Sequence, residues 1–320
     1  MTPHDAQQEI LTRTPEMESV MRAATLVAQT DVTVLITGES GTGKERIGHL
    51  VHAESRRNTG PWVPVNCAAL QDNLAESELF GHVRGAFTGA TEAHQGRVRA
   101  ASGGTLFLDE VGELTLPLQA KLLRLLENRE CQVVGQAQPV QVDTRIVAAT
   151  NVDLAQRVKD GRFREDLFYR LNIAPLTLPP LRNRPRDIPL LMDHFLVEAA
   201  ARFERTPPRF TPKAMQQIQH HRWPGNIREL LNFCTRMVIY HGGEEVDLAE
   251  LPPELKDGEE IPAKGAPFDL PTQGVDLAAV ERGLIKQALE RSTGNKSKAA
   301  RLLGLTRDTL LYRLKKHTLD

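Results

Sequence analysis

The sequence VTVLITGESGTGKE, residues 32–45, decides the fold of this 320-residue chain. Residues 32–37 are apolar and β-branched and predict a buried strand, and a helix is predicted to begin near residue 44. A glycine-rich turn between them presents backbone N–H groups to nucleotide phosphates, and its lysine reaches the β and γ oxygens. The turn consists of Gly38, Glu39, Ser40, Gly41, Thr42, Gly43 and Lys44. This strand–loop–helix context predicts a nucleotide site in an α/β fold.

Two later strand ends are predicted to complete the nucleotide site. Residues 105–110, TLFLDE, end in Asp109 and Glu110, an arrangement that places an Asp on hydrated Mg²⁺ and a Glu on the attacking water. Asn151, at the end of another strand, is positioned for the γ-phosphate or that water. Glu45 departs from the general motif, since Ser or Thr usually holds the magnesium there. The pattern predicts ATP and Mg²⁺ as cofactors. For residues 105–110, the alternative is an ordinary strand that ends in a polar turn.

Hydrophobic periodicity divides the chain into an α/β part and a helical part. Apolar runs alternate with helical patterns up to about residue 180, which predicts a parallel sheet covered by helices on both faces. The predicted strands span residues 32–37, 62–65, 105–108, 145–149 and 173–178. From residue 187 onward the predicted elements are helices at residues 187–203, 211–220 and 226–241.

Charge separates a basic tail from an acidic body. Residues 281–320 carry ten Lys or Arg against four Asp or Glu, a balance of +6, so the first 280 residues carry −7 of the net charge of −1. A small basic tail on an acidic body indicates that the tail binds nucleic acid. A solvated basic helix face is the alternative.

Composition favours a soluble globular protein. An apolar fraction of 40% supports a substantial core. There is no charged-then-apolar leader and no apolar run of roughly 20 residues, so a cytoplasmic protein is expected. Cys67, Cys131 and Cys234 lie far apart without metal-ligand spacing and are predicted to be buried thiols.

These motifs resemble those of the bacterial enhancer-binding proteins, the AAA+ activators of sigma-54 RNA polymerase. Residues 38–45, GESGTGKE, match the P-loop of that family, Glu45 included, and residues 103–110, GGTLFLDE, match its Walker B segment. The most specific match is the family signature GAFTGA, expected to form the loop that contacts the sigma factor. This loop consists of Gly85, Ala86, Phe87, Thr88, Gly89 and Ala90.

The resemblance implies roles for single residues. Asn66 is expected to restrain the catalytic glutamate and report the nucleotide state, and Asn151 is expected to act as sensor I. Arg164 and Arg170 match the arginine fingers that reach the γ-phosphate of the neighbouring subunit, and Arg228 matches sensor II on the helical lid. A finger in trans makes hydrolysis depend on assembly, so a ring, hexameric in the family, is implied. A surface salt bridge is the alternative for each arginine alone.

The basic tail has helix-turn-helix form. In residues 294–310, Ala299 and Ala300 allow close helix packing, Gly304 makes the turn, and the next helix buries leucines on one face. The other face is left for phosphates and base edges, although a purely structural three-helix bundle is the alternative. The segment resembles the Fis-type domain, in which an earlier helix, here residues 276–292, dimerises. The predicted DNA-binding residues are Thr306, Arg307, Thr309, Arg313, Lys315 and Lys316.

The resemblance covers about residues 10–318 and implies five segments. They are a short N-terminal extension (1–9), an AAA+ α/β ATPase core (10–180), an all-α lid (181–250), a linker (251–275) and a three-helix Fis-type domain (276–320). Because only about nine residues precede the ATPase pattern, we expect the chain to lack the N-terminal receiver domain of most relatives. Regulation is then expected from expression level or a separate regulatory protein.

The implied function is a sigma-54-dependent activator that binds upstream enhancer DNA. Such an activator hydrolyses ATP in a ring and remodels the closed complex of sigma-54 RNA polymerase into the open complex. A general AAA+ remodeller recruited to DNA and a DNA-binding regulator with a weak ATPase are the alternatives. The GAFTGA string disfavours the first alternative, and the intact catalytic residues disfavour the second.

Two residues depart from the family pattern. Relatives usually read Gly-Arg-Phe-Glu after GAFTGA, whereas Arg99 stands here in place of the carboxylate. Relatives usually carry an Arg before the next Val-Gly, where this chain has Val133. These changes would disturb a charge pair unless it is compensated. One hypothesis is a weak activator helped by a related partner subunit, and the other is compensation within the same subunit.

Overall fold

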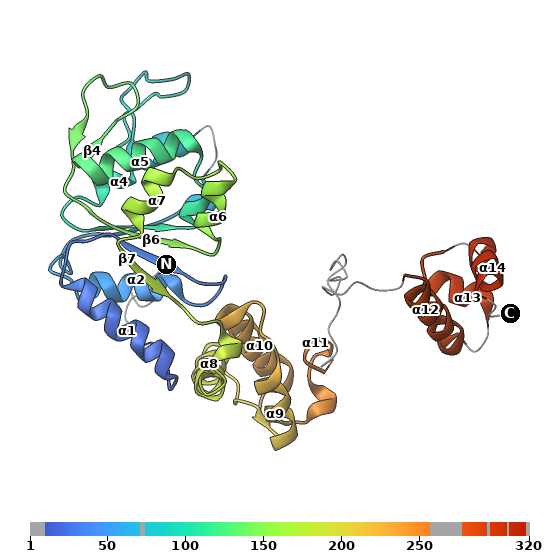
Figure 1. The fold of residues 1–320 in the computed structure, drawn as a ribbon. Helices are drawn as coiled ribbons and strands as arrows, with labels where there is room; N and C mark the ends of the chain where they lie inside the picture. The colour runs from blue at the N-terminus through green and yellow to red at the C-terminus, as the bar shows by residue number, and fades with distance from the viewer. Residues whose placement is uncertain (1–9, 71–73, 257–276, 293–294, 306, 318–320) are drawn as a thin grey trace. The chain divides into compact units, whose positions relative to one another are not determined.

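The computed structural model describes residues 10–70, 74–256, 277–292, 295–305 and 307–317 (Figure 1). The predictions for residues 1–9, for residues 257–275 of the linker and for Thr306 therefore lie outside the described residues. The chain divides into two compact units, Met1–Gly258 and Glu259–Asp320, which are described separately. Within the described residues, none of the helices has both the length and the apolar character that crossing a membrane requires.

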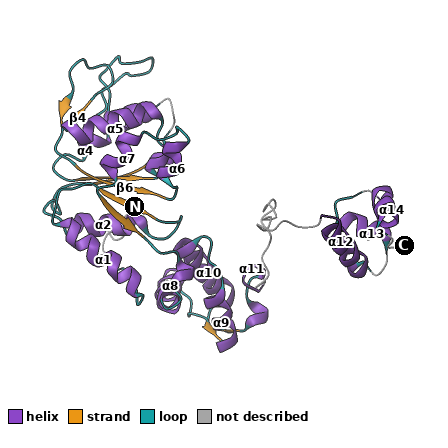
Figure 2. Ribbon diagram, viewed as in Figure 1, coloured by secondary structure: helices purple, strands orange, loops and turns teal. Residues whose placement is uncertain are grey.

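The first unit is built on a sheet of five parallel strands in the order β2-β3-β6-β1-β7 (Figure 2). All five predicted strands are present, and the α/β fold with a parallel sheet is confirmed. The central strands are almost wholly buried, as expected where helices cover both faces. The strands are β1 (Val34–Thr37), β2 (Trp62–Asn66), β3 (Thr105–Asp109), β6 (Arg145–Thr150) and β7 (Ala174–Thr177).

Two hydrophobic clusters hold helices against the two faces of this sheet. One cluster joins the sheet to α1 (Pro15–Ala28) and α2 (Lys44–Ala53), and the other joins its opposite face to α3 through α7 (Figure 1). The remaining helices are α3 (Ala75–Phe80), α4 (Arg97–Ala100), α5 (Leu116–Asn128), α6 (Leu154–Lys159), α7 (Glu165–Leu171) and the 3-10 turns η2 (Cys67–Ala69), η3 (Val111–Glu113) and η4 (Leu181–Asn183). An antiparallel pair, β4 (Glu130–Cys131) with β5 (Val140–Gln141), was not predicted.

The helical lid packs around Trp223, which is fully buried. The lid consists of α8 (Asp187–Phe203), α9 (Pro212–His220), α10 (Asn226–His241), the short strands β8 (Arg209–Phe210) and β9 (Glu245–Val246), η5 (Leu248–Glu250) and α11 (Pro253–Lys256). The prediction that a linker begins at residue 251 is wrong. Leu251 and Leu255 are each 1% exposed in the lid core, so the lid continues through residue 256.

The second unit is a three-helix bundle with a helix-turn-helix, as predicted. Its helices are α12 (Leu277–Arg291), α13 (Lys296–Leu302) and α14 (Arg307–Lys316). Ala299 and Ala300 are buried between helices together with Leu310 and Leu314. Gly304 has a φ of 65°, a left-handed conformation that suits the turn before α14.

The three cysteines are free and buried, as predicted. Burial raises the pKa of the Cys67 thiol to about 12, with a smaller contribution from Asp109 and Glu110. Burial also raises the pKa values of Cys131 and Cys234. The thiols are therefore protonated at neutral pH and act as small core side chains.

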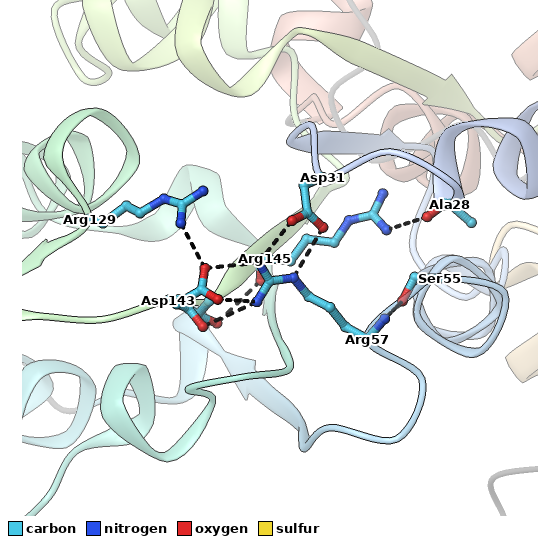
Figure 3. Close-up of polar contacts among 8 residues, drawn as sticks. Ala28, Asp31, Ser55, Arg57, Arg129, Asp143 and Arg145 are labelled. Atoms are coloured by element: carbon cyan, nitrogen blue, oxygen red, sulfur yellow. Dashed lines mark hydrogen bonds and ion pairs between the residues drawn. The ribbon is translucent and has the colours of Figure 1, made fainter.

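A network of charged side chains joins the loops that precede β1 and β6 to the loop that follows α2 (Figure 3). Arg57 donates to both carboxylate oxygens of Asp31, at 2.8 and 3.1 Å, and to both of Asp143, at 2.9 and 3.1 Å. Arg129 adds a bond to Asp143 at 2.9 Å, and buried Arg145 donates to Ala28 O at 2.9 Å. The Arg57 side chain is 13% exposed, whereas those of Asp31 and Asp143 are 53% and 55% exposed, so the guanidinium holds two loops together at a partly solvated point.

We expect Arg57→Met to lower the free energy of unfolding at pH 7 by about 1 kcal/mol, because two ion pairs are lost and solvent around the half-exposed carboxylates weakens each of them. Hydrogen bonds from Arg57 hold the pKa values of Asp31 and Asp143 below the usual 3.8. Stability from such depressed values is present above the unfolded pKa and is lost as the pH falls through the folded pKa. Urea unfolding from pH 7 to pH 3 measures the free energy of unfolding of the unmodified protein and of Arg57→Met. The difference between the two free energies should shrink as the pH falls below about 4.

The matched control is Arg56→Met, which removes an exposed neighbouring guanidinium. It should shift the free energy of unfolding by less than about 0.5 kcal/mol. Equal effects of the two substitutions would contradict the network.

Candidate functional site

The P-loop holds its lysine against its own backbone. It follows β1 and runs into α2, whose N-cap Gly43 is left-handed with a φ of 96°. Lys44 is only 6% exposed, and its Nζ donates to Gly38 O at 3.0 Å and Glu39 O at 3.4 Å. Glu45 is exposed in the first turn of α2. The loop is therefore ordered around the ammonium group that would meet phosphate oxygens.

Glu110 lies close to three segments predicted to form the nucleotide site: the P-loop, the end of β3 and the end of β6. Its Oε2 accepts a hydrogen bond from the backbone N–H of Asn151 at 3.0 Å, and its Oε1 lies 3.5 Å from Lys44 Nζ. Its own N–H donates to Asp109 Oδ1 at 3.0 Å. Glu110 also has a φ of 53°, a left-handed conformation that is uncommon for this residue type and is concentrated at functional sites. The structure thus brings Lys44, Asp109, Glu110 and Asn151 together.

Asn66 lies beside the acidic pair but turns to another partner. β2 and β3 run in register, with Asn66 paired to Asp109. The side-chain Oδ1 of Asn66 accepts from Ala68 N at 3.0 Å and caps η2. The structure shows no contact from Asn66 to Glu110, which the resemblance implies; among the described residues the Glu110 carboxylate contacts Lys44 Nζ and Asn151 N.

Two residues that were not predicted from the sequence, Asn226 and Arg182, bind the tip of the P-loop. Asn226 is fully buried and has a φ of 51°. Its Nδ2 donates to Ser40 O at 3.0 Å and to Glu39 Oε2 at 3.2 Å. Its Oδ1 accepts from Leu181 N at 2.7 Å. Arg182 binds both carboxylate oxygens of Glu39, at 2.6 and 2.8 Å. This hydrogen bonding by Arg182 lowers the pKa of Glu39, with Asn226 adding to the effect.

Backbone contacts close the same junction. The N–H of Ile227 donates to Gly41 O at 2.9 Å. A Cβ on Gly41 would lie 2.3 Å from Gly225 O, so only glycine allows this approach. Arg228, the predicted sensor II, donates from Nη1 to Ser40 Oγ at 3.0 Å. The sensor arginine therefore lies at the P-loop, where a lid would respond to bound nucleotide.

The two predicted fingers lie on the surface of the core. Arg164 precedes α7, and Arg170 stands in its last turn. Both side chains are exposed, and Arg164 forms a bidentate pair with Asp166, at 2.7 and 3.0 Å. That hydrogen bond raises the pKa of Arg164, so the guanidinium remains charged. An exposed, charged pair of this kind is available to a neighbouring molecule.

The GAFTGA segment folds back on itself. Gly85 N donates to Ala90 O at 2.9 Å, and Ala90 N donates to Phe87 O at 3.0 Å. Gly85 and Gly89 have left-handed φ values of 81° and 106°. The Phe87 ring is 37% exposed and lies 5.0 Å from the ring of His82. The hexapeptide therefore forms a closed loop with an aromatic side chain at the surface.

The base of this loop is fastened to the segment after β4. Val83 N donates to Val134 O at 3.1 Å, and Val134 N donates to Gly81 O at 3.0 Å. A Cβ on Gly135 would lie 2.8 Å from the Cβ of Ala86, so the two segments are in direct contact. A movement of either segment must then involve the other.

The two departures from the family pattern are both accommodated inside the chain. Arg99 donates from Nε to Gln95 O at 2.6 Å and from Nη2 to His94 O at 3.0 Å. Val133 is 1% exposed and belongs to the hydrophobic cluster that also holds Cys131. Backbone carbonyls thus satisfy the guanidinium, and an apolar side chain occupies a site where a charge would be buried.

In the second unit, α14 presents basic side chains to solvent. Arg307, Lys315 and Lys316 are exposed, whereas Thr309 is half-buried. Arg313 is half-buried and forms an ion pair with Glu281 of α12. The His317 ring also binds Glu281, at 2.9 Å. Arg313 therefore has an intramolecular partner that the sequence analysis did not anticipate.

Comparison with known families divides the chain as the geometry does. A family model described as "Sigma-54 interaction domain" matches residues 10–177, and one described as "AAA+ ATPase lid domain" matches residues 182–266. A third, described as "Bacterial regulatory protein, Fis family", matches residues 276–317.

Similar proteins cover nearly all of the chain. The transcriptional regulatory protein ZraR of Klebsiella oxytoca is 48% identical over 313 residues, which are 97% of this chain and 69% of ZraR. The regulatory protein AtoC of Escherichia coli is 46% identical over 316 residues, 97% of this chain and 68% of AtoC. The crystal structure of NtrX from Brucella abortus in complex with ATP superposes with a TM-score of 0.73 at 32% identity, covering 98% of this chain and 70% of NtrX. The chain therefore belongs to the sigma-54 interaction domain family and is a sigma-54-dependent transcriptional activator with an AAA+ ATPase core.

Proposed function

We propose that this protein binds upstream enhancer DNA and hydrolyses ATP in a ring to convert the closed complex of sigma-54 RNA polymerase into the open complex. One observation carries the proposal: a closed GAFTGA loop and the Glu110 site belong to one ATPase core. The Lys44 ammonium binds the β and γ phosphates, and Glu110 orients and polarises the attacking water. Asn151 reports the γ-phosphate through its position beside Glu110.

Magnesium fits the acidic end of β3. Asp109 offers carboxylate oxygens, which are the donors that Mg²⁺ prefers, and Mg²⁺ takes most of its other ligands from water and phosphates. When bound, the ion neutralises developing charge on the phosphates.

Assembly supplies the remaining part of the ATPase site. Arg164 and Arg170 are exposed on α7, and their proposed target is the γ-phosphate in the neighbouring subunit of a hexamer. Asn66 restrains Glu110 in the nucleotide-bound state, after turning from Ala68 N. Arg228 reports bound nucleotide to the lid through Ser40. This machinery is proposed to act in the cytoplasm.

Two further elements connect the ATPase to its targets. The loop with Phe87 and Thr88 contacts the sigma factor, and its base passes movement from the ATPase core through Val134. The Fis-type unit binds enhancer DNA as a dimer, with Arg307, Lys315 and Lys316 exposed on α14. A separate regulatory protein is a further proposed partner. Help from a related partner subunit is the weaker hypothesis, because Arg99 and Val133 are satisfied within the chain.

The decisive experiment is transcription in vitro from a sigma-54 promoter with purified polymerase, this protein and ATP. Open complexes that need ATP hydrolysis support the proposal. Activation with a non-hydrolysable analogue, or on a promoter read by another sigma factor, would contradict it.

Glu110→Gln is expected to keep ATP binding while lowering turnover by about 100-fold or more, because an amide cannot polarise water as a carboxylate does. Steady-state phosphate release and binding of a fluorescent ATP analogue separate the two effects. Glu127→Gln, at an exposed position on α5, is the matched control and should leave both unchanged. Normal turnover by Glu110→Gln would remove this carboxylate from the mechanism.

Thr88→Ala should keep most ATPase activity and lose open-complex formation, since the loop lies outside the nucleotide site and transmits force to the sigma factor. Single-round transcription at matched ATP turnover measures the uncoupling. Thr91→Ala, an exposed threonine just beyond the hexapeptide, is the control. Full activation by Thr88→Ala would rule out this role.

Arg313→Ala is expected to weaken enhancer binding and to reduce the salt slope of log K by about 1 if a phosphate contact is lost. Glu281→Gln separates this role from a structural one, because it removes the negative charge that pairs with Arg313 and leaves the guanidinium. Binding titrations at several salt concentrations should find weaker binding only for Arg313→Ala. Equal weakening by both variants would mean that Arg313 acts by holding α14 against α12.

A further inference from the structure

Gln119 is a buried glutamine whose side chain makes three hydrogen bonds. It lies in the first turn of α5 and has no exposed surface. Its Nε2 donates to Leu114 O at 2.8 Å and to Arg162 O at 3.0 Å, and its Oε1 accepts from Arg164 N at 2.9 Å. Both amide protons and one acceptor site are therefore used. A displacement of any partner would leave a buried polar group unpaired, so the amide fixes all three positions.

The partners of Gln119 belong to two different parts of the ATPase mechanism. Leu114 ends η3, the turn that begins directly after Glu110. Arg164 is the residue before α7, and Arg162 stands two positions earlier. One side chain thus connects the segment after the catalytic strand end with the peptide that carries the proposed finger.

Arg157 makes a second connection between the same segments. Its Nη1 donates to Gly112 O at 2.6 Å, and its Nη2 binds Glu113 Oε1 at 2.6 Å. Its backbone carbonyl accepts from Arg162 N at 2.9 Å and from Phe163 N at 3.1 Å. Because Phe163 is 2% exposed, the turn before Arg164 is anchored in the core as well.

The Arg164 side chain itself is less restrained than its backbone. Its guanidinium pairs only locally, with Asp166 two residues away, and the side chain is 43% exposed. A long side chain of this kind reaches a defined point in a neighbouring molecule only if its Cα is held in place. The Gln119 bond to Arg164 N provides that restraint.

We propose that Gln119 is a positioning residue for ATP hydrolysis in the neighbouring subunit, because it fixes the backbone from which the Arg164 finger extends. The inference rests on the proposed role of Arg164 in trans. It predicts that a change at Gln119 impairs the nucleotide site of the next subunit and leaves the subunit's own site competent. A purely structural role would impair both sites.

The test uses Gln119→Met, which keeps the length of the side chain and removes all three hydrogen bonds. Alone, it should lower ATP turnover by between about 10- and 100-fold, as expected when a reacting group is misplaced by about 1 Å. ATP binding should be unchanged. Gln156→Met makes the same chemical change at an exposed glutamine on α6 and is the matched control, with normal turnover.

Rings assembled from subunits of two variants then show which nucleotide site Gln119→Met impairs. Glu110→Gln subunits have an inactive site and intact fingers, whereas Arg164→Ala subunits have an intact site and lack the Arg164 finger. A 1:1 mixture of these two should regain turnover, to about a quarter of that of the unmodified protein if interfaces act independently. Gln119→Met should regain the same turnover when mixed with Glu110→Gln subunits and should regain none when mixed with Arg164→Ala subunits.

The mixtures separate the possible failures. Recovery with Arg164→Ala but not with Glu110→Gln would mean that Gln119 serves its own site, and would overturn the proposal, as would normal turnover by Gln119→Met alone. No recovery in the reference mixture of Glu110→Gln with Arg164→Ala would instead overturn the trans role of Arg164. If Gln119→Met fails to bind ATP, Gln119→Asn, which keeps the amide and shortens its reach, is tested in the same mixtures. The same pattern of recovery supports the proposal, and the reverse pattern overturns it.

Discussion

The carboxylate of Glu110 ties together the ends of three parallel strands. It receives the N–H of Asn151 after β6, pairs with Lys44 after β1, and follows Asp109 at the end of β3. Parallel strands bring their carboxyl ends to one edge of a sheet, so this contact depends on the strand order β3-β6-β1. Phosphate entering the P-loop would compete for the Lys44 ammonium and free the glutamate for water. If Glu110 acts as proposed, this ion pair would link substrate binding to activation of the attacking water.

The lid is linked to the same loop by a different kind of contact. Asn226 and Arg182 both bind Glu39, and Ile227 N–H binds Gly41 O. These bonds reach the backbone and side chains at the tip of the P-loop. A change in P-loop conformation must therefore move the lid, break the contacts, or both. Since Asn226 is fully buried, its amide cannot exchange these partners for water without opening the junction.

The sequence predicted the parts of this arrangement that depend on local pattern. The five strands followed from apolar runs, because strands buried on both faces are apolar throughout. The P-loop and the acidic pair, Asp109 and Glu110, were predicted from residue spacing alone. The Glu39 junction, the buried Gln119 and the Glu281–Arg313 pair were not, since each joins residues that are distant in the chain.

Two errors have identifiable physical causes. The Pro- and Gly-rich composition after residue 251 hid two leucines, Leu251 and Leu255, which are spaced to pack on one side of the lid. The β4–β5 pair was missed because each strand is two residues long and carries no period. The orientation of Asn66 was also not predicted from the sequence, since the bond that its Oδ1 accepts from Ala68 N depends on the turn η2.

Both departures from the pattern of the resemblance, Arg99 and Val133, have local solutions in the fold. Arg99 uses two backbone carbonyls at the base of the GAFTGA loop, and a hydrogen bond from a charged donor to a carbonyl needs no opposite charge. Val133 removes the second charge from the core, where an unpaired arginine would be strongly unfavourable. The two changes are therefore consistent with each other inside one subunit, and the connection between the loop and the segment after β4 is carried by backbone hydrogen bonds at Val134 in place of an ion pair.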